Sequence, residues 1–433
     1  MKMWNKKSLS QSKLDEFIIG KDRYYDLFLT QYDCKASIAH VRMLEKIGVY
    51  NKNESKKVIL ELKKIILDSK KENFILEDKF EDIHSKIEFI ITEKYGDLGK
   101  KIHTGRSRND QVLVAIQLYL KKELNEIKYL TKDLFDILLN LALINKNNLM
   151  PGYTHFQSAM PSSFGLWFSA YAESLIDDIE IINSAHFIVD QNPMGSAAGY
   201  GSSIPIDRLQ TTKDLEFNEL KYNSLSSQMS REKIGISTSN AISSLANTLS
   251  RFSTDICLYM SQEFNFISFP NELTTGSSIM PHKKNPDIFE ILRGRCNILK
   301  NLPSKLNILS SNLPSGYHRD MQLSKEIIIE GILEIKEYLK IFAECIKKIK
   351  IKKDILNNSK YDHIFSVDSI NKYLQNGIPF RDAYHMLKDD IKSKKYKPYK
   401  KIKHTHIGSI GNLCLNKIKK KMENTLIKRD EKL

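Results

Sequence analysis

One stretch of the chain, from Asp110 to Met150, contains neither glycine nor proline, and its apolar residues recur at every third or fourth position. These apolar positions are Ile116, Leu120, Leu124, Ile127, Leu130, Leu134, Leu138 and Leu141. The spacing predicts one face of an α-helix of about 40 residues, roughly 60 Å long. Similar patterns cover residues 166–192, 236–269, the segment after Pro286, and 320–357. Because strand-like alternation is scarce, we expect an all-α protein built around a bundle of long helices, whose apolar faces form the core or a subunit interface.

The length of the chain indicates more than one domain. A chain of 433 residues can bury a large core, and chains of this size usually divide into two or three domains. We expect an N-terminal helical domain at residues 1–108, the central long-helix bundle at residues 109–357, and a small helical C-terminal domain at residues 358–433.

Several classes of protein are disfavoured by the composition. No apolar run approaches the roughly 18 residues of a membrane span, and the N-terminus lacks the apolar region of a secretory signal. The five cysteines are scattered and none are spaced CxxC, which favours reduced thiols over disulfides or a zinc site. We therefore expect a cytoplasmic protein that does not bind a membrane.

The formal net charge of +15 raises the question of nucleic-acid binding. Much of the excess lies late in the chain, at residues 345–356, 392–404 and 416–430. There the lysines alternate with isoleucine and leucine at helical spacing, and arginine, the better ligand for bases and phosphates, is scarce. This pattern favours solvated lysine faces of helices over a nucleic-acid surface.

Polar, small-residue junctions separate the predicted helices. Five of them are KKIHTGRSRNDQ (100–111), PGYTHFQSAMPSS (151–163), NPMGSAAGYGSSIPIDR (192–208), TTGSSIMPHKKNPD (274–287) and LPSGYHRDMQLSKE (313–326). Connections in a helical bundle need only a few residues, and longer ones tend to carry function. We therefore expect a site assembled from the ends of several helices.

The residue types in these junctions indicate an anionic small-molecule substrate. A serine of the Ser277-Ser278 pair and His155 could move protons, and the cations Arg106, Arg108, Lys283, Lys284 and Lys325 could bind carboxylates. There is no Walker-type phosphate loop and no HExxH motif, and His404 and His406 alone are a weak metal site.

The junctions resemble one known family. GSSIMPHKKNPD is similar to the signature loop of the fumarase/aspartase superfamily, whose members cleave C–N or C–O bonds to release fumarate. TGRSRNDQ narrows the resemblance to the argininosuccinate lyase family, and GYTHFQSAMP, NPMGSAAGYGSSIPIDR and the EDIH of residues 81–84 resemble further segments of it. The similarity runs from about Phe17 to HIGSIGNL (406–413), nearly the whole chain.

The resemblance implies a β-elimination that converts argininosuccinate to arginine and fumarate. Proton removal beside a carboxylate creates a doubly charged aci-carboxylate, which Lys283 and Asn285 would stabilise. The family's serine base matches Ser277, and its acid matches His155, oriented by a carboxylate at Glu290. The acid and base roles have been assigned both ways in the superfamily, and we favour the serine as the base.

Further substrate contacts follow from the same residue-by-residue match. They are Ser107, Arg108, Asn109, Thr154, Tyr317, Gln322, Lys325, His84, Asp82 and Arg231. The chain departs from the family pattern at Ile18, Ser158 and Met160, where relatives often carry Ser or Thr, Arg and Gln.

The resemblance also implies a homotetramer with active sites shared between subunits, and it implies neither a cofactor nor a metal. Competing interpretations are another lyase of the superfamily, such as adenylosuccinate lyase, and a non-catalytic structural protein that keeps the fold. Nucleic-acid binding is a third alternative.

Overall fold

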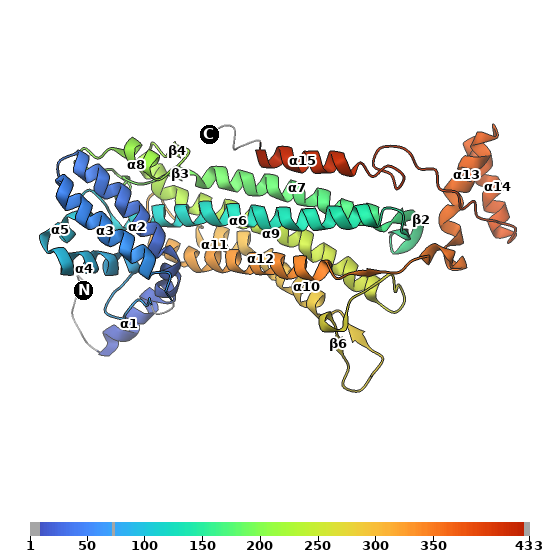
Figure 1. The fold of residues 1–433 in the computed structure, drawn as a ribbon, viewed down its shortest axis with the longest axis horizontal. Coiled ribbons are helices and arrows are strands. Elements are labelled where there is room, and N and C mark those ends of the chain that lie inside the picture. Colours follow the sequence, from blue (N-terminus) through green and yellow to red (C-terminus); the bar gives the residue numbers. More distant parts are fainter. Residues whose placement is uncertain (1–8, 72–73, 428–433) are drawn as a thin grey trace.

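The computed structural model describes residues 9–71 and 74–427, and long helices dominate it. Five of them run side by side as the central bundle in Figure 1. They are α6 (Arg108–Ile144), α7 (Phe164–Val189), α9 (Ser224–Met260), α10 (Asp287–Leu299) and α12 (Ser324–Ile346). Each of the five predicted helical patterns corresponds to one of these helices, so the predicted all-α fold with a long-helix bundle is confirmed. No helix in this described part of the chain is long and apolar enough to cross a membrane.

The N-terminal helices pack across one end of the bundle (Figure 1). They are α1 (Leu9–Ile19), α2 (Asp22–Lys46), α3 (Lys52–Asp68), α4 (Ile83–Tyr95) and α5 (Asp97–Lys100), followed by a 3-10 turn at Lys101–His103. A separate apolar core, which includes Val41, Leu62 and Ile87, holds α2, α3 and α4 together. Helix α2 also packs on α6 and α12, which joins this unit to the bundle.

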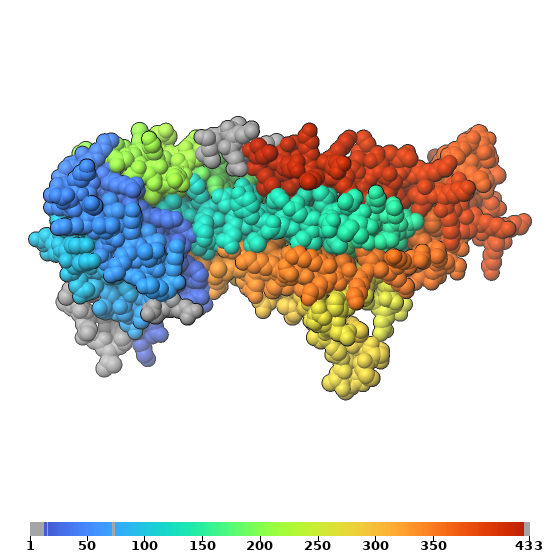
Figure 2. Space-filling model, in the orientation of Figure 1, coloured from blue at the N-terminus to red at the C-terminus, as the bar shows by residue number. Residues whose placement is uncertain are grey.

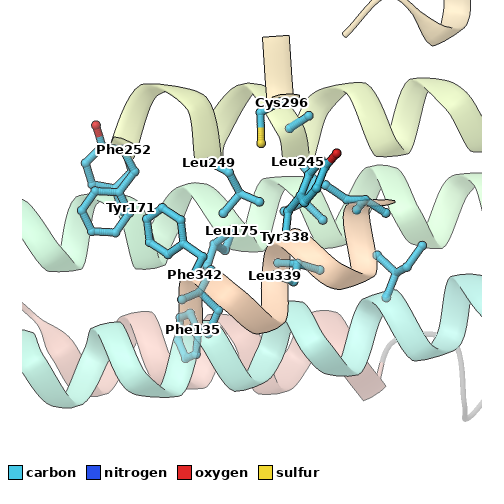
Figure 3. Packing of buried hydrophobic residues seen from close by; sticks show 14 of the residues in the cluster. Phe135, Tyr171, Leu175, Leu245, Leu249, Phe252, Cys296, Tyr338, Leu339 and Phe342 are labelled. Carbon is cyan, nitrogen blue, oxygen red and sulfur yellow. The ribbon is translucent and has the colours of Figure 1, made fainter. Parts of the chain in front are cut away.

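The bundle core consists of apolar side chains from every long helix. Figure 3 shows part of it, with Phe135 of α6, Tyr171 of α7, Phe252 of α9 and Phe342 of α12 labelled. The rings of Tyr171 and Phe252 stack with their centroids 4.0 Å apart. Because each fully buried side chain of this kind contributes about 1.5–3 kcal/mol, this core dominates the stability of the fold.

Helix α9 differs most from its predicted range, because it begins twelve residues before Ile236 and ends at Met260. Asn223 caps its first turn by accepting a hydrogen bond from the backbone of Ser226. The early turns are rich in serine, and small buried residues such as Ser227 and Ser230 pack there without forming an apolar stripe. Apolar periodicity therefore does not reveal these turns.

The polar junction at 151–163 is a β-hairpin, which the sequence did not predict. Strand β1 (Leu149–Thr154) pairs antiparallel with β2 (Gln157–Ser163), and Pro151 faces Pro161 across the ladder. Proline normally argues against a strand, but a two-stranded ribbon has two open edges where a missing N–H costs little. The tip residues His155 and Phe156 have φ values of 53° and 59°.

The remaining strands are two-residue pairs at junctions. They are β3 (Gln191–Asn192) with β4 (Glu219–Leu220), β5 (Ile267–Ser268) with β8 (Lys350–Ile351), and β6 (Thr275–Gly276) with β7 (Lys284–Asn285). Shorter helical elements fill the other connections: α8 (Arg208–Asp214), α11 (Leu302–Leu309), and 3-10 turns at Asn271–Leu273, Arg319–Leu323, Ile355–Asn357 and Ser359–Phe365.

The C-terminal part divides into two pieces, where one small domain at 358–433 was predicted. Helices α13 (Ser366–Gln375) and α14 (Phe380–Lys392) form a small unit with its own core, at the end of the bundle opposite the N-terminal helices (Figure 1). Helix α15 (Leu415–Ile427) instead returns along α7, where Ile418 and Met422 join the bundle core. Its amphipathic face needs an apolar partner, and α7 supplies it.

Tight packing where α6 meets α7 generates a stability prediction. A methyl group on Gly165 would lie 2.6 Å from the Cα of Lys146 and 3.0 Å from the carbonyl oxygen of Ala142. We expect Gly165→Ala to lower the free energy of unfolding by about 1–3 kcal/mol, because backbone atoms must shift.

Gly294→Ala is the matched control for this substitution. Gly294 lies inside α10, and a methyl group added there would meet no atom within 4 Å. We expect this substitution to raise the free energy of unfolding by roughly 0.5–1 kcal/mol through helix propensity. Chemical denaturation followed by circular dichroism measures both, and equal stability of the two variants would contradict the packing at Gly165.

Candidate active site

A cavity of about 310 Å³ opens where the N-terminal helices meet the bundle. Its walls come from the end of α1, from α2, α4, α6, α9 and α12, and from the segment before α12. Seven of the residues predicted to contact substrate line it: Asp82, Arg108, Asn109, Arg231, Tyr317, Gln322 and Lys325. The folded chain therefore brings together residues that lie up to 243 positions apart in the sequence.

The first turns of α4 and α6 place an ion pair at one wall of the cavity. Asp82 caps α4 by accepting a hydrogen bond from the backbone of Ser85 at 2.7 Å. The Nε of Arg108, the first residue of α6, lies 3.2 Å from a carboxylate oxygen of Asp82. Burial disfavours the charge of Asp82, but the neighbouring His84 and Arg108 outweigh it and lower the pKa of its carboxyl group. The Arg108 guanidinium is thereby held at the cavity wall.

Lys325 lies at the base of the cavity between two carboxylates of α2. It is 3% exposed, its ammonium group lies 2.7 Å from Asp22, and it also forms an ion pair with Asp26. Burial raises the pKa of Asp22 to about 6, although the Lys325 charge opposes this shift. A lysine in the first turn of a helix is usually solvated, but Lys325 is buried and paired.

Arg231 and Tyr317 form a third wall. The Arg231 guanidinium lies over the Tyr317 ring, 5.3 Å from its centroid, and Arg231 is only 4% exposed. Its Nε has no hydrogen-bond partner among the described residues. Gln322 donates a hydrogen bond to the carbonyl oxygen of Ile18 at 3.0 Å. Ile18 thus contributes its backbone carbonyl to the contact with Gln322. This contact does not depend on the Ser or Thr hydroxyl that relatives often carry at this position.

His84 does not line the cavity, in contrast to the prediction. It is fully buried beneath Asp82, and its Nδ1 lies 3.1 Å from the carboxylate of Asp33. Burial disfavours the charge of Asp33, but His84 and then Arg106 outweigh it and lower its pKa. His84 lies behind the cavity wall because it is the second residue of the helix that Asp82 caps, and its ring meets Asp33 of α2.

Ser107 caps α6 and is not a cavity residue. Its side chain accepts a hydrogen bond from the Asn109 backbone, while Asp110 accepts one from the Ser107 backbone at 2.9 Å. The other oxygen of Asp110 accepts hydrogen bonds from the backbones of Gly195 and Ala197, each at 3.0 Å. A single buried carboxylate therefore ties the junction at 100–111 to the junction at 192–208.

The signature loop lies outside the cavity on a projecting flap, defined here as residues 275–285. The short strands β6 and β7 form its base, and Figure 2 shows it standing out from the bundle surface. The hydroxyl oxygen of Ser277 accepts hydrogen bonds from the backbones of Met280 at 3.1 Å and Ile279 at 3.4 Å. Lys283 is exposed and Asn285 is half-buried.

Glu290 lies just beyond the flap in the first turn of α10. Its carboxylate is 3.9 Å from the Arg293 guanidinium. The expected partner, His155, is instead at the exposed tip of the β1–β2 hairpin, together with Thr154. Figure 1 places this hairpin at the end of the bundle opposite the N-terminal helices. Within the described part of one chain, no hydrogen bond or ion pair joins His155 to Glu290.

The length of α6 determines how far apart the predicted site residues lie. Arg108 begins this helix, and the hairpin that carries His155 follows five residues after its end. A helix of 37 residues is about 55 Å long at 1.5 Å per residue. Within one chain, the cavity and His155 therefore lie at opposite ends of the bundle. The flap projects from the side of the bundle (Figure 1).

The sequence did not identify four charged residues of the cavity: Asp22, Asp26, Glu81 and Arg319. Asp22 and Asp26 are four residues apart and share one face of α2, a spacing that was visible but is also common on solvated helices. Together with the predicted residues they give the cavity four carboxylates and four cationic side chains. Such a balanced lining suits a ligand that carries both positive and negative groups.

Comparisons with known proteins agree with this geometry. A family model described as "Lyase" matches residues 1–298. Argininosuccinate lyase from Phocaeicola vulgatus is 47% identical over 98% of this chain and 95% of the relative. Argininosuccinate lyase from Thermotoga neapolitana is 36% identical over 89% of this chain and 97% of the relative. Class II fumarase from Schistosoma mansoni, a solved structure, has a TM-score of 0.72 at 16% identity, covers 85% of each chain, and thus shares the fold.

The buried charges around Lys325 generate a second prediction. Replacing Lys325 with Met leaves Asp22 and Asp26 without their cation, so we expect the free energy of unfolding to fall by about 3–5 kcal/mol near neutral pH. The pKa of Asp22, about 6, already lies above its unfolded value of roughly 3.9, so its ionisation destabilises the fold as pH rises through this window. The variant's deficit should therefore shrink as pH falls toward 4.

Lys340→Met on the exposed face of α12 is the control and should change the free energy of unfolding little. Denaturant unfolding at several pH values measures both variants. A Lys325→Met deficit that is independent of pH would contradict the buried ion pairs.

Proposed function

The chain belongs to the argininosuccinate lyase family, and we propose that Ser277, His155 and the charged cavity together carry out the family's reaction. The reaction is the β-elimination of argininosuccinate to arginine and fumarate, which completes arginine biosynthesis. We place it in the cytoplasm. The observation that carries the proposal is the cavity, in which seven residues matched to the family's binding positions are gathered around balanced charges.

The cavity holds the substrate in this proposal. Argininosuccinate carries a guanidinium, an ammonium and three carboxylates, so it needs both signs of charge around it. Tyr317, Gln322 and Lys325 bind the arginine-derived end, while Arg108 and Asn109 bind carboxylates of the other end. The acidic residues of α2 then face the cationic groups. Because these side chains are held by hydrogen bonds and ion pairs before substrate arrives, little ordering remains for the binding step.

Ser277 removes the proton beside the carboxylate. A serine hydroxyl is too weak a base at neutral pH unless its anion is stabilised. Two backbone N–H groups already point at the Ser277 oxygen, and they would stabilise an alkoxide more strongly than the neutral hydroxyl. Lys283 adds positive charge when the flap closes on the cavity. With Asn285, it also stabilises the aci-carboxylate that forms.

His155 donates a proton to the departing guanidinium nitrogen. His155 is exposed at the tip of the hairpin, with a left-handed backbone, where another subunit can reach it. Glu290 of another subunit orients the ring and stabilises its protonated form. The elimination then balances: Ser277 takes the proton, the electron pair left on carbon forms the C=C bond of fumarate, the C–N bond breaks with its electrons leaving on nitrogen, and His155 protonates that nitrogen.

These roles require a homotetramer with shared active sites. Arg108 and His155 are separated by about the length of α6, roughly 55 Å, so one chain cannot bring them together. A two-fold axis perpendicular to the bundle places the cavity end of one chain beside the hairpin end of its partner. The flap comes from a further chain in this arrangement.

Replacing Ser277 tests the assignment of the base. We expect Ser277→Ala to lower kcat for argininosuccinate by about 10²–10⁴-fold, because the substituted chain lacks the proton acceptor. Fumarate absorbance measures the rate. Ser278→Ala, one residue along the same flap, is the matched control and should retain most of the activity. Equal rates for Ser277→Ala and the unsubstituted protein would show that Ser277 is not the base. If the protein released fumarate from adenylosuccinate but not from argininosuccinate, the proposed substrate would be wrong.

Mixing two inactive variants tests the shared site. Ser277→Ala damages the flap and Arg108→Gln damages the cavity, so each homotetramer should be inactive. If flap and cavity come from different chains, dissociation and random reassociation of equal amounts should restore about a quarter of the sites. Mixing without dissociation is the control. No recovery after verified subunit exchange would indicate that flap and cavity belong to the same chain.

A further inference from the structure

Gln111 lies behind the wall of the cavity, near the start of α6. It is 3% exposed and does not line the cavity, although Arg108, Asn109 and Val112 beside it do. Both ends of its side-chain amide form hydrogen bonds in this buried position. The reaction proposed above gives Gln111 no role, and its two partners indicate one.

The amide oxygen of Gln111 holds the guanidinium of Arg108. Nη1 of Arg108 donates a hydrogen bond to this oxygen at 2.8 Å. The other two nitrogens are held from the start of α4: Nε lies 3.2 Å from Asp82, and Nη2 donates to the hydroxyl of Ser85 at 3.3 Å. A planar guanidinium with a contact at each nitrogen has little freedom to turn. Because Nη1 carries two N–H groups, one remains for a ligand.

The amide nitrogen of Gln111 donates a hydrogen bond to Asp33 of α2. The bond is 3.0 Å long, and Asp33 is fully buried. Burial opposes the ionisation of Asp33, but His84 and then Arg106 outweigh it and lower the pKa of the carboxyl group. An ionised carboxylate can only accept hydrogen bonds, so Asp33 requires the N–H end of the amide.

These two partners fix the direction in which the Gln111 amide faces. In the reverse orientation, the amide oxygen would face the carboxylate of Asp33, and the NH₂ group would face the guanidinium of Arg108. Acceptor would then meet acceptor and donor would meet donor, away from water, which is costly at both ends. Asp33 thus ensures that Gln111 presents an oxygen to Arg108.

The charges are arranged so that Arg108 is not neutralised from this side. The group that touches Nη1 is a neutral amide oxygen, whereas the negative charge that orients the amide belongs to Asp33, one contact further away. His84, whose Nδ1 lies 3.1 Å from Asp33, and Arg106 offset that negative charge. A carboxylate in direct contact with Nη1 would instead weaken the attraction of Arg108 for an anionic ligand.

We propose that Gln111 is a positioning residue for Arg108, with the orientation of its amide set by Asp33. The relay from Asp33 through Gln111 fixes the guanidinium at the cavity wall and leaves its positive charge for a carboxylate of the substrate. This inference rests on the proposed function, which assigns the carboxylates of the end that becomes fumarate to Arg108 and Asn109.

Equilibrium dialysis of labelled fumarate against the full-length protein tests the proposal without requiring turnover. Methionine matches the length of glutamine but makes neither hydrogen bond. We expect Gln111→Met to bind fumarate about tenfold more weakly, because the freed guanidinium must be ordered on binding. Binding of labelled arginine, which the proposed function places at Tyr317, Gln322 and Lys325, should not change. A general loosening of the fold would weaken the binding of both ligands.

Gln117→Met, on the same helix, is the matched control. Gln117 is 1% exposed and donates hydrogen bonds to the backbone carbonyls of Val189 and Gln191, neither of which lines the cavity. This substitution also removes two buried hydrogen bonds, but it should leave fumarate binding unchanged. Equal weakening of fumarate binding by the two substitutions would overturn the proposal, because the effect would then not be specific to Arg108.

Gln111→Asn is a second variant, which keeps the test decisive if thermal unfolding shows that Gln111→Met does not fold. Its amide is one methylene too short to reach both Asp33 and Arg108 from the same backbone position. We expect weaker binding of fumarate and unchanged binding of arginine. Fumarate affinity equal to that of the unsubstituted protein, in whichever of the two variants folds, would overturn the proposal.

Arg108→Gln separates this inference from the proposed function. It should weaken fumarate binding by about 100-fold, because the cation itself is lost. If Arg108→Gln weakens binding and the Gln111 variants do not, this inference is wrong and the proposed function stands. If Arg108→Gln binds fumarate like the unsubstituted protein, Arg108 does not bind the carboxylate, and both are wrong on this point.

Discussion

An unbroken helix that spans the whole bundle is the constraint on which the rest of this structure depends. Helix α6 holds its first residue at the cavity and its last residue near the β1–β2 hairpin, and it packs against α7, α9 and α12. A rigid rod of this length keeps two groups of reactive side chains apart. In the proposed reaction the two groups act at one site, and a partner chain running in the opposite direction would bring them together. The proposed assembly thus follows from the length of α6 combined with the proposed chemistry.

Buried charges then organise the end of the bundle where the cavity lies. Asp110 joins two junctions through three backbone N–H groups, and Lys325 joins α12 to α2 through two carboxylates. Such groups add little net stability compared with apolar packing, but an unpaired buried charge is so costly that only one arrangement is tolerated. Asp110 is fully buried, and this burial raises its pKa to about 6 against the effect of the backbone hydrogen bonds. The cavity is therefore shaped in advance, whereas the flap projects into solvent.

The periodicity of apolar residues predicted much of the fold. The pattern from Asp110 to Met150 predicted α6 to within six residues at each end. It failed where packing uses small polar residues, as at the start of α9, and where proline sits on the open edge of a ribbon, as in the β1–β2 hairpin. Motifs indicated seven of the residues that line the cavity but not Asp22 or Asp26, whose i, i+4 spacing is common on helix surfaces. His84 was misplaced because a motif reports neighbours in sequence and not the direction of a side chain.

The central claim is that the flap of one chain closes on the cavity of another. Lysine cross-linking of a tetramer assembled from equal amounts of isotopically light and heavy chains tests it most directly, with mass spectrometry of the linked peptides. Lys283 on the flap and Lys21 beside the cavity are both exposed and provide natural attachment points. We expect Lys283–Lys21 links, about half of which join a light peptide to a heavy one. Links that join only peptides of the same isotope would mean that flap and cavity belong to one chain, and would contradict the claim.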